Sequence, residues 1–176
     1  IEDEKVTGCL PFWHQANNLN DLAASANEGN GAWWLYKWYG DMSGVTQPVS
    51  SSTEYDLLYG LSTMDESKKL STTILGGFTG DITVELDNIT KTDAFRGAKK
   101  VHVRVEETMF TGFHGALDEP PTIIEGTFEV SDGKVIVEIE GARFENAYKV
   151  TVMQAADDET AGDISYTRNS VVYEAE

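Results

Sequence analysis

The chain has 176 residues, of which 40% are hydrophobic and 10% aromatic, enough for the core of one domain, or of one domain with a small appended piece, and too many for a disordered protein. Its 30 acidic and 13 basic residues give a formal net charge of −17, which disfavours nucleic acids and anionic membranes as partners and suits neutral partners or divalent cations. The single cysteine, Cys9, excludes an intrachain disulfide, and no run reaches the ~18 apolar residues of a membrane span.

The first predicted element is a short apolar strand at residues 5–13. A polar, asparagine-rich connection follows at residues 15–30, and within it residues 19–24 allow one short helical turn. The N-terminus, Ile-Glu-Asp-Glu-Lys, lacks the pattern of a signal peptide. We therefore expect an internal part of a longer protein, which is secreted or lies at the cell surface.

An aromatic segment at residues 31–42 predicts a helix that ends at Gly40 or Gly44. Its aromatic and large apolar side chains fall on three faces of a helical wheel: Trp34 and Trp38 on the first, Leu35, Tyr39 and Met42 on the second, and Trp33 and Tyr36 on the third. A helix that is apolar almost all round is buried on several sides. We therefore expect this helix to lie between two neighbours.

From residue 55 onward apolar and polar residues alternate with the period of a β-strand. Glycine-rich and acidic turns separate the runs, among them Ser131-Asp132-Gly133, a good hairpin signal. The predicted strands are 55–61, 69–75, 81–86, 100–106, 123–130, 134–140, 147–153 and 170–173. This series predicts a mainly β fold, an antiparallel β-sandwich of about eight strands at residues 45–176, preceded by a strand-loop-helix segment at residues 1–44.

Two stretches of the predicted sandwich carry a resemblance to a known family. The run from Tyr59-Gly60-Leu61 through Gly76-Gly77-Phe78-Thr79-Gly80 to Val84, together with residues 132–134 and 147–152, resembles the β-sandwich that follows the catalytic barrel in clan A glycoside hydrolases, most nearly those akin to family 39. The resemblance implies that residues 1–44 are the last βα unit of a (β/α)8 barrel. The aromatic helix would then lie between the barrel wall and the sandwich.

The same resemblance implies that this chain lacks the catalytic carboxylate pair, because such barrels carry the acid/base after the fourth strand and the nucleophile after the seventh. The acidic residues present are expected on solvated strand edges and loops: Glu106, Glu107, Glu138, Glu140 and residues 157–159. Whether the chain itself is an enzyme stays open at this point. The parent protein is expected to be a glycoside hydrolase.

Substrate contact is the role that a last βα unit can supply, because the loops at the carboxyl ends of barrel strands line the active site. The residues at that end of the predicted strand are Trp13, His14, Gln15 and Asn17. A tryptophan ring can stack on a sugar, and the polar side chains can bond its hydroxyls. The alternative is that Trp13 closes the floor of the barrel and His14 is structural.

Two loops in the sandwich are further candidates. The irregular stretch at residues 109–121 offers Phe110, Phe113 and His114 for sugar contact, or else packs its phenylalanines beneath itself or against the aromatic helix. The acidic loop at residues 157–163 could hold calcium through Asp157, Asp158 and Asp163, although it lacks the spacing of an EF-hand. The three histidines are too scattered to predict zinc, and the alternation along residues 100–104 places His102 in solvent.

Three functions follow from these observations. The first is a non-catalytic accessory β-sandwich of a secreted glycoside hydrolase acting on extracellular polysaccharide, where it would buttress the catalytic barrel. The second is a self-contained carbohydrate-binding module that uses exposed aromatics, Trp33, Trp34 and Trp38 or Phe110 and Phe113, as a glycan platform. The third is an adhesive or structural sandwich of the immunoglobulin type. They differ in whether the aromatics face a protein neighbour, a sugar or neither.

Overall fold

The computed structural model describes residues 23–25, 28–52, 58–111 and 115–167. Two short strands, β1 (Ala23–Ser25) and β2 (Glu28–Gly29), pair just before the helix α1 (Gly31–Asp41). The predicted strands at residues 5–13 and 170–173, and most of the predicted helical turn, lie outside the described residues. Residues 23 and 24 correct that turn, because both belong to strand β1, in which Ala23 pairs with Gly29.

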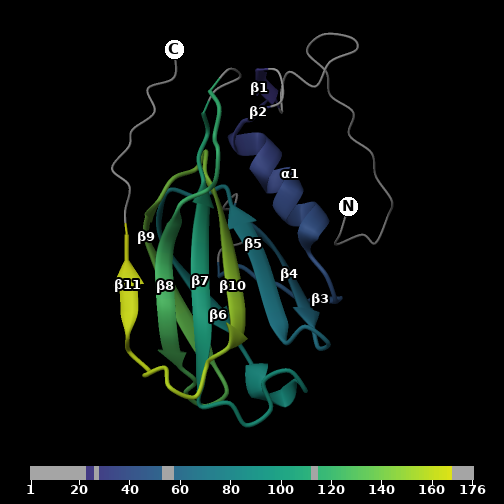
Figure 1. Cartoon of the computed structure of the whole chain (residues 1–176), viewed down its shortest axis with the longest axis vertical. Coiled ribbons are helices and arrows are strands. Elements are labelled where there is room, and N and C mark those ends of the chain that lie inside the picture. Colours follow the sequence, from purple (N-terminus) through teal and green to yellow (C-terminus); the bar gives the residue numbers. More distant parts are fainter. Residues whose placement is uncertain (1–22, 26–27, 53–57, 112–114, 168–176) are drawn as a thin grey trace.

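A seven-stranded antiparallel sheet forms the main layer, in the order β11-β8-β7-β10-β5-β4-β3 (Figure 1). Its strands are β3 (Val45–Gln47), β4 (Tyr59–Asp65), β5 (Leu70–Gly76), β7 (Lys100–Thr108), β8 (Thr122–Glu129), β10 (Ala147–Gln154) and β11 (Ile164–Tyr166). A second sheet pairs β6 (Gly80–Leu86) with β9 (Val135–Ala142), and the short 3-10 helix η1 (Ile89–Lys91) follows β6. The predicted mainly β sandwich with a short helix before it is confirmed.

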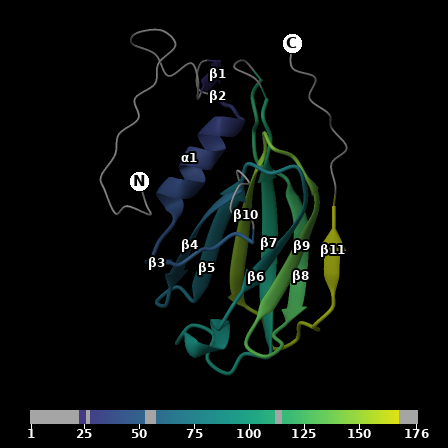
Figure 2. The same ribbon diagram turned by 180° about the vertical axis from the view of Figure 1, so that it is seen from behind.

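The two faces of the large sheet have different neighbours. Successive side chains point to opposite faces of a strand, so the alternating valines of β7 and β10 lie on the face that the second sheet covers. There they form the core with Val135, Val137 and Ile139 of β9. The opposite face carries Lys149 and Thr108, which contact α1. Figure 2 shows the molecule from behind. There β6 and β9 cover the core face of the large sheet, and α1 lies on the opposite face of that sheet.

One fully buried tyrosine closes the end of this core. The hydroxyl of Tyr148 donates to Glu107 Oε1 at 2.9 Å and accepts from the backbone N–H of Arg143 at 3.0 Å. Burial raises the pKa of Tyr148 well above its usual value. The solvated position expected for Glu107 is therefore wrong, because this carboxylate is partly buried as the acceptor of Tyr148 and Asn146.

The Ser131-Asp132-Gly133 turn forms as predicted, with Asp132 and Gly133 at φ values of 50° and 78°. Ser131 and Lys134 exchange two backbone hydrogen bonds across it. However, the strands that it joins do not pair with each other: β8 belongs to the large sheet and β9 to the small one. The turn thus carries the chain from one layer of the sandwich to the other.

The hairpin of β4 and β5 differs most from the predicted pattern. Strand β4 runs from Tyr59 to Asp65, past the predicted end at residue 61, while residues 55–57 of the predicted strand lie outside the described residues. The far end of β4 has serine, threonine and methionine buried together. Asp65 organises the turn, because its carboxylate accepts from Ser67 Oγ at 2.6 Å, Ser43 Oγ at 2.7 Å and the N–H of Lys68 at 3.0 Å. The bonds from Ser67 and Ser43, followed by that from Lys68, hold the pKa of Asp65 well below its usual range.

Candidate functional site

Helix α1 begins at a clamp between its first residue and the end of β7. The side chain of Asn30 caps the helix by accepting from the N–H of Trp33 at 3.0 Å. Gly31 lies so close to β7 that an added Cβ would sit 1.7 Å from the carbonyl oxygen of Met109. Its carbonyl accepts from Thr108 Oγ1 at 2.8 Å, and its N–H donates to Thr111 Oγ1 at 3.1 Å. Only glycine allows this approach.

The other end of α1 differs from the prediction. The helix ends at Asp41, and its C-cap, Met42, is extended with φ −61° and ψ 138°. Neither Gly40 nor Gly44 caps it in the left-handed region. Gly44 instead has φ +94° within the connection to β3, where a Cβ would come within 2.1 Å of the carbonyl oxygen of Met64.

The first predicted face of α1 packs on the large sheet. Trp38 is 3% exposed, and Lys149 Nζ lies 5.0 Å from the centre of its ring, within the range of a cation–π contact. The same ammonium lies 2.5 Å from a carboxylate oxygen of Glu106, so Glu106 is also more enclosed than a solvated face would be. Trp34 is half-buried, and its indole N–H donates to the carbonyl oxygen of Leu117 at 2.6 Å.

The third predicted face points away from the sheet. Tyr36 is 59% exposed. Trp33 meets Trp34 edge to face, with ring centroids 4.9 Å apart, and its indole covers the backbone of Gly29. The helix therefore has one face anchored to the sandwich and one exposed aromatic face. A second neighbour that would bury this face stays a prediction.

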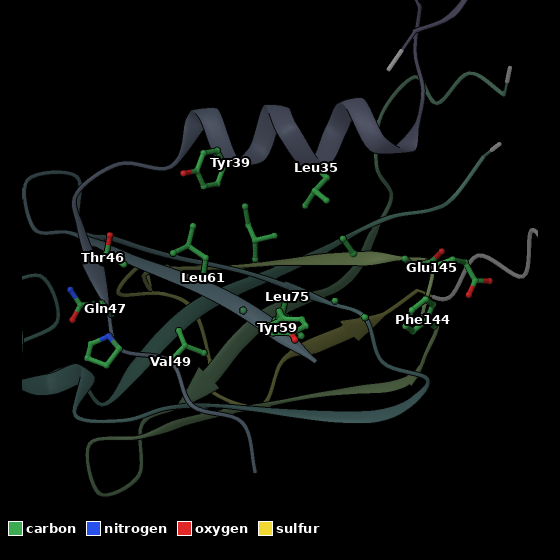
Figure 3. A pocket seen from close by; sticks show the side chains of 17 residues that line it. Leu35, Tyr39, Thr46, Gln47, Val49, Tyr59, Leu61, Leu75, Phe144 and Glu145 are labelled. Carbon is green, nitrogen blue, oxygen red and sulfur yellow. The ribbon is translucent and has the colours of Figure 1, made fainter. Parts of the chain in front are cut away.

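The second predicted face roofs a cleft between α1 and the large sheet. Leu35 and Tyr39 point into it from the helix, above Leu61 and the sheet (Figure 3). The cleft has a volume of about 910 Å³. The described residues that line it come from four parts of the chain. They are Leu35 and Tyr39 of α1, residues 46–49 in β3 and just after it, residues 59–61 and 74–77 at the facing ends of β4 and β5, and residues 144–147 at the turn before β10.

Aromatic rings from three separate elements border this cleft. They are Tyr39 of α1, Tyr59 at the start of β4, and Phe144 in the turn between β9 and β10, and each is half exposed or more. Neither Tyr59 nor Phe144 is among the site residues predicted from the sequence. Phe144 offered a signal, because a large aromatic side chain in a polar turn between two strands is unusual.

The other predicted sugar-contact residues are distributed differently. Trp13, His14, Gln15, Asn17, Phe113 and His114 lie outside the described residues. Phe110 is 49% exposed, and its N–H donates to Asn146 Oδ1 at 3.3 Å. Asn146 is buried beside the cleft, so Phe110 and the cleft share one anchoring residue, although Phe110 is not in the described lining.

The acidic loop predicted as a possible calcium site is organised by a lysine. Lys100 Nζ donates to the carbonyl oxygens of Asp157 and Glu159, which are groups that a bound cation would need. The side chains of Asp157, Asp158 and Asp163 are exposed. Among the residues with described positions, no three acidic, histidine or cysteine side chains come together in a way that could hold a metal ion.

His102 lies on the outer face of β7, as its alternation predicts, yet it is partly covered rather than in free solvent. Its ring nitrogens lie 3.3 Å from Glu159 Oε2 and 3.5 Å from Glu125 Oε1. The hydroxyl of Thr127 and then His102 hold the pKa of Glu159 below its usual value, and Arg104 does the same for Glu125. This cluster fastens the loop before β11 to the sheet, which is a structural role.

In comparisons with known proteins, two long glycosidases each match this chain over a small part of their own length. A 3-O-alpha-D-galactosyl-alpha-L-arabinofuranosidase of Bifidobacterium longum subsp. longum is 35% identical over 149 residues, covering 74% of this chain and 13% of that enzyme. A 3-O-beta-L-arabinopyranosyl-alpha-L-arabinofuranosidase of Bifidobacterium pseudocatenulatum is 34% identical over 137 residues, covering 70% and 14% respectively. The chain thus spans about an eighth of these relatives. It is a β-sandwich domain that partially matches arabinofuranosidase-type glycoside hydrolases.

A solved structure supports the same fold. The structure of N2152 from Neocallimastix frontalis superposes with a TM-score of 0.70 at 29% identity, covering 77% of this chain and 33% of that one. No family model matches the sequence. Within the described residues, no helix is long and apolar enough to cross a membrane.

Proposed function

We propose that this chain is the non-catalytic accessory β-sandwich of a secreted glycoside hydrolase that acts on extracellular polysaccharide. The observation that carries the proposal is the partial match: about three quarters of the chain aligns with about an eighth of two arabinofuranosidases. A segment that small is suited to an appended domain. The resemblance to post-barrel sandwiches akin to family 39 remains part of this proposal.

The geometry of α1 supports a buttressing role. Its first face is anchored to the sandwich through Trp34 and Trp38, while Tyr36 and part of Trp33 face solvent. A catalytic barrel packed on that outer face would bury them, as expected for the last helix of a (β/α)8 barrel made with residues 1–44. The pair of catalytic carboxylates would then lie in the barrel.

The names of the relatives suggest the substrate class of the parent enzyme. Both are arabinofuranosidases whose names specify a second sugar at the 3-O position. We therefore assign to the parent an arabinofuranosyl linkage in a branched extracellular glycan, and a location outside the cell or at its surface. The accessory domain would hold the barrel in place and leave the reaction to it.

An activity assay tests the non-catalytic assignment. The purified chain should release no product from an aryl α-L-arabinofuranoside, with a complete arabinofuranosidase as the positive control. Measurable turnover that survives further purification would overturn the assignment.

A surface substitution tests the buttressing role in the longer protein that this proposal implies. Tyr36→Ser should lower the melting temperature of that protein and leave the isolated chain unchanged, because the ring is buried only when the barrel is present. Tyr166→Ser is the matched control, since Tyr166 is 68% exposed on the far edge strand, β11. Equal effects of the two substitutions in the longer protein would contradict the docking face.

A self-contained carbohydrate-binding module is the second candidate, and one observation favours it. Several large aromatic side chains are exposed, among them Tyr36, Tyr39 and Phe110. Affinity electrophoresis of the chain in gels with soluble polysaccharides tests it directly. Retardation by a glycan supports the binding module, and unchanged mobility across a broad panel counts against it.

A further inference from the structure

We infer that the cleft between α1 and the ends of β4 and β5 is a binding site for an uncharged oligosaccharide, which stacks on Tyr59 and Phe144 beneath Tyr39. This site differs from the aromatic face that would dock a barrel, because Tyr39 and Leu35 point toward the sheet (Figure 3), whereas Tyr36 is 59% exposed and is not in the described lining. The inference therefore does not depend on the accessory role.

The cleft is a consequence of how α1 is attached. The clamp at Gly31 and the packing of Trp34 and Trp38 hold the helix against β7, the loop that follows it, and β10. Over β4 and β5 the helix offers only Leu35 and Tyr39, and the sheet below offers Gly76 beside Leu61 and Ile74. These side chains do not fill the space between the two layers. The volume of about 910 Å³ lies within the range of about 300–1,000 Å³ that is typical of small-ligand sites.

The lining has the chemistry of a sugar site. A pyranose or furanose ring presents C–H groups on its faces and hydroxyls at its edge, so it pairs with aromatic faces that have polar groups beside them. Tyr59 and Phe144 supply exposed rings, and the aliphatic floor of Leu61 and Ile74 accepts further C–H surface. Polar groups at the border come from Thr46, Gln47 and Glu145.

The charge of the site selects an uncharged ligand. Glu145 contributes a carboxylate to the lining and is paired with Arg143 at 2.8 Å, and no lysine or arginine is among the lining side chains described there. The whole chain carries a formal net charge of −17, so a polyanionic sugar would be repelled on approach and would find no basic side chain in the described lining. A neutral oligosaccharide meets neither penalty.

The backbone that carries Phe144 is held in position before any ligand arrives. Its N–H donates to Thr79 Oγ1 at 3.0 Å, and the next two residues are fixed by the ion pair of Arg143 with Glu145 at 2.8 Å and by the buried side chain of Asn146. A binding residue on a fixed turn loses little conformational freedom when the ligand binds. The turn between β9 and β10 is therefore suited to present an aromatic platform.

Isothermal titration calorimetry tests the inference. The purified chain is titrated with three probes at millimolar concentration: neutral arabino-oligosaccharides, neutral galacto-oligosaccharides and an oligogalacturonate of similar length. Heat of binding is expected for a neutral probe and not for the oligogalacturonate. Tyr59→Ala and Phe144→Ala should each raise the Kd at least about tenfold, which corresponds to ~1.4 kcal/mol.

Tyr166→Ala is the matched control, because Tyr59 and Tyr166 are 69% and 68% exposed and lie near opposite edges of the same sheet. It should change the Kd by less than about twofold, and circular dichroism should give the same spectrum for all variants. Three results would overturn the inference: no binding of either neutral probe, unchanged binding by both cleft variants, or equal binding of the oligogalacturonate. None of them alters the test of the accessory role, which rests on activity and on Tyr36.

Discussion

The two faces of the large sheet are built from the same strands and yet are packed in opposite ways. On the face toward β6 and β9, Val101, Val103 and Val105 alternate with no exposed surface and meet a second apolar layer. On the face toward α1, threonines and charged residues alternate under a single helix, and the hydroxyl of Thr63 lacks a hydrogen-bond partner within the described part of the chain. The first face is organised for stability, and the second leaves a cleft and an aromatic surface available for binding.

The largest effect expected from this comparison is on the core side. Phe95→Ala removes a ring that is 1% exposed and packs in the core cluster, and such truncations cost about 3–5 kcal/mol. Chemical denaturation followed by far-UV circular dichroism should show a much lower midpoint with an unchanged slope. A loss below ~1 kcal/mol would mean that the core is not the main source of stability.

A substitution at the helix clamp should separate the two faces. Gly31→Ala places a methyl group against the carbonyl of Met109, so the start of α1 must move away from β7, at a cost of about 1–3 kcal/mol. We expect red-shifted, more quenchable tryptophan emission, with the sandwich still folded by circular dichroism. Gly40→Ala is the matched control, because no atom lies within 4 Å of its added Cβ, and it should stabilise the helix by about 0.5–1 kcal/mol. Similar spectra for the two variants would contradict the clamp.

The hairpin turn on the helix side should respond to acid through Asp65. Its pKa is lowered in the folded chain by the bonds from Ser67, Ser43 and Lys68, so its stabilisation is fully present above the unfolded value of about 3.9 and is lost as the pH falls below it. Asp65→Asn should therefore melt lower than the natural chain at pH 7, and the two melting temperatures should converge at lower pH. A difference that is constant between pH 7 and acid would contradict this assignment.

The smallest effect is expected on the solvent side of α1. Tyr36 is 59% exposed, and substitutions at such positions usually change stability by less than about 0.5 kcal/mol. Tyr36→Ser should thus leave the melting temperature of the isolated chain almost unchanged. A large loss would show that the ring is packed within the chain, and would remove the outer face as a docking surface.

Local pattern accounts for much of the fold. The alternating runs predict strands β6 to β10 to within about two residues at each end, because each has one face in the core and one outside it. The helical wheel separates three faces of α1, and each has different surroundings in the structure: the sheet, the cleft and solvent. These are features that period and side-chain polarity determine.

The remaining differences arise from contacts that are distant in the sequence. Strands β3 and β11 have three residues each, too few to show a period. In β4 and β5 the alternation is hidden, because both faces are covered and Ser62 bonds Thr73 in the interior at 2.9 Å. Apart from the aromatic side chain of Phe144 in a polar turn, the cleft has no local signal, since it depends on a clamp between Gly31 and Thr108, which lie far apart in the sequence.

The position of β10 has a consequence for how the chain is made. This strand joins β5 to β7 at the centre of the large sheet, yet it follows the other long strands of that sheet in the described part of the chain. Until residue 154 has left the ribosome, β3–β4–β5 and β7–β8 are two part-sheets, each with an open edge where β10 will pair. Open edges are templates for pairing with other chains. A nascent chain that pauses within β9 therefore keeps both of these edges open, and pairing of β10 with β5 and β7 closes them.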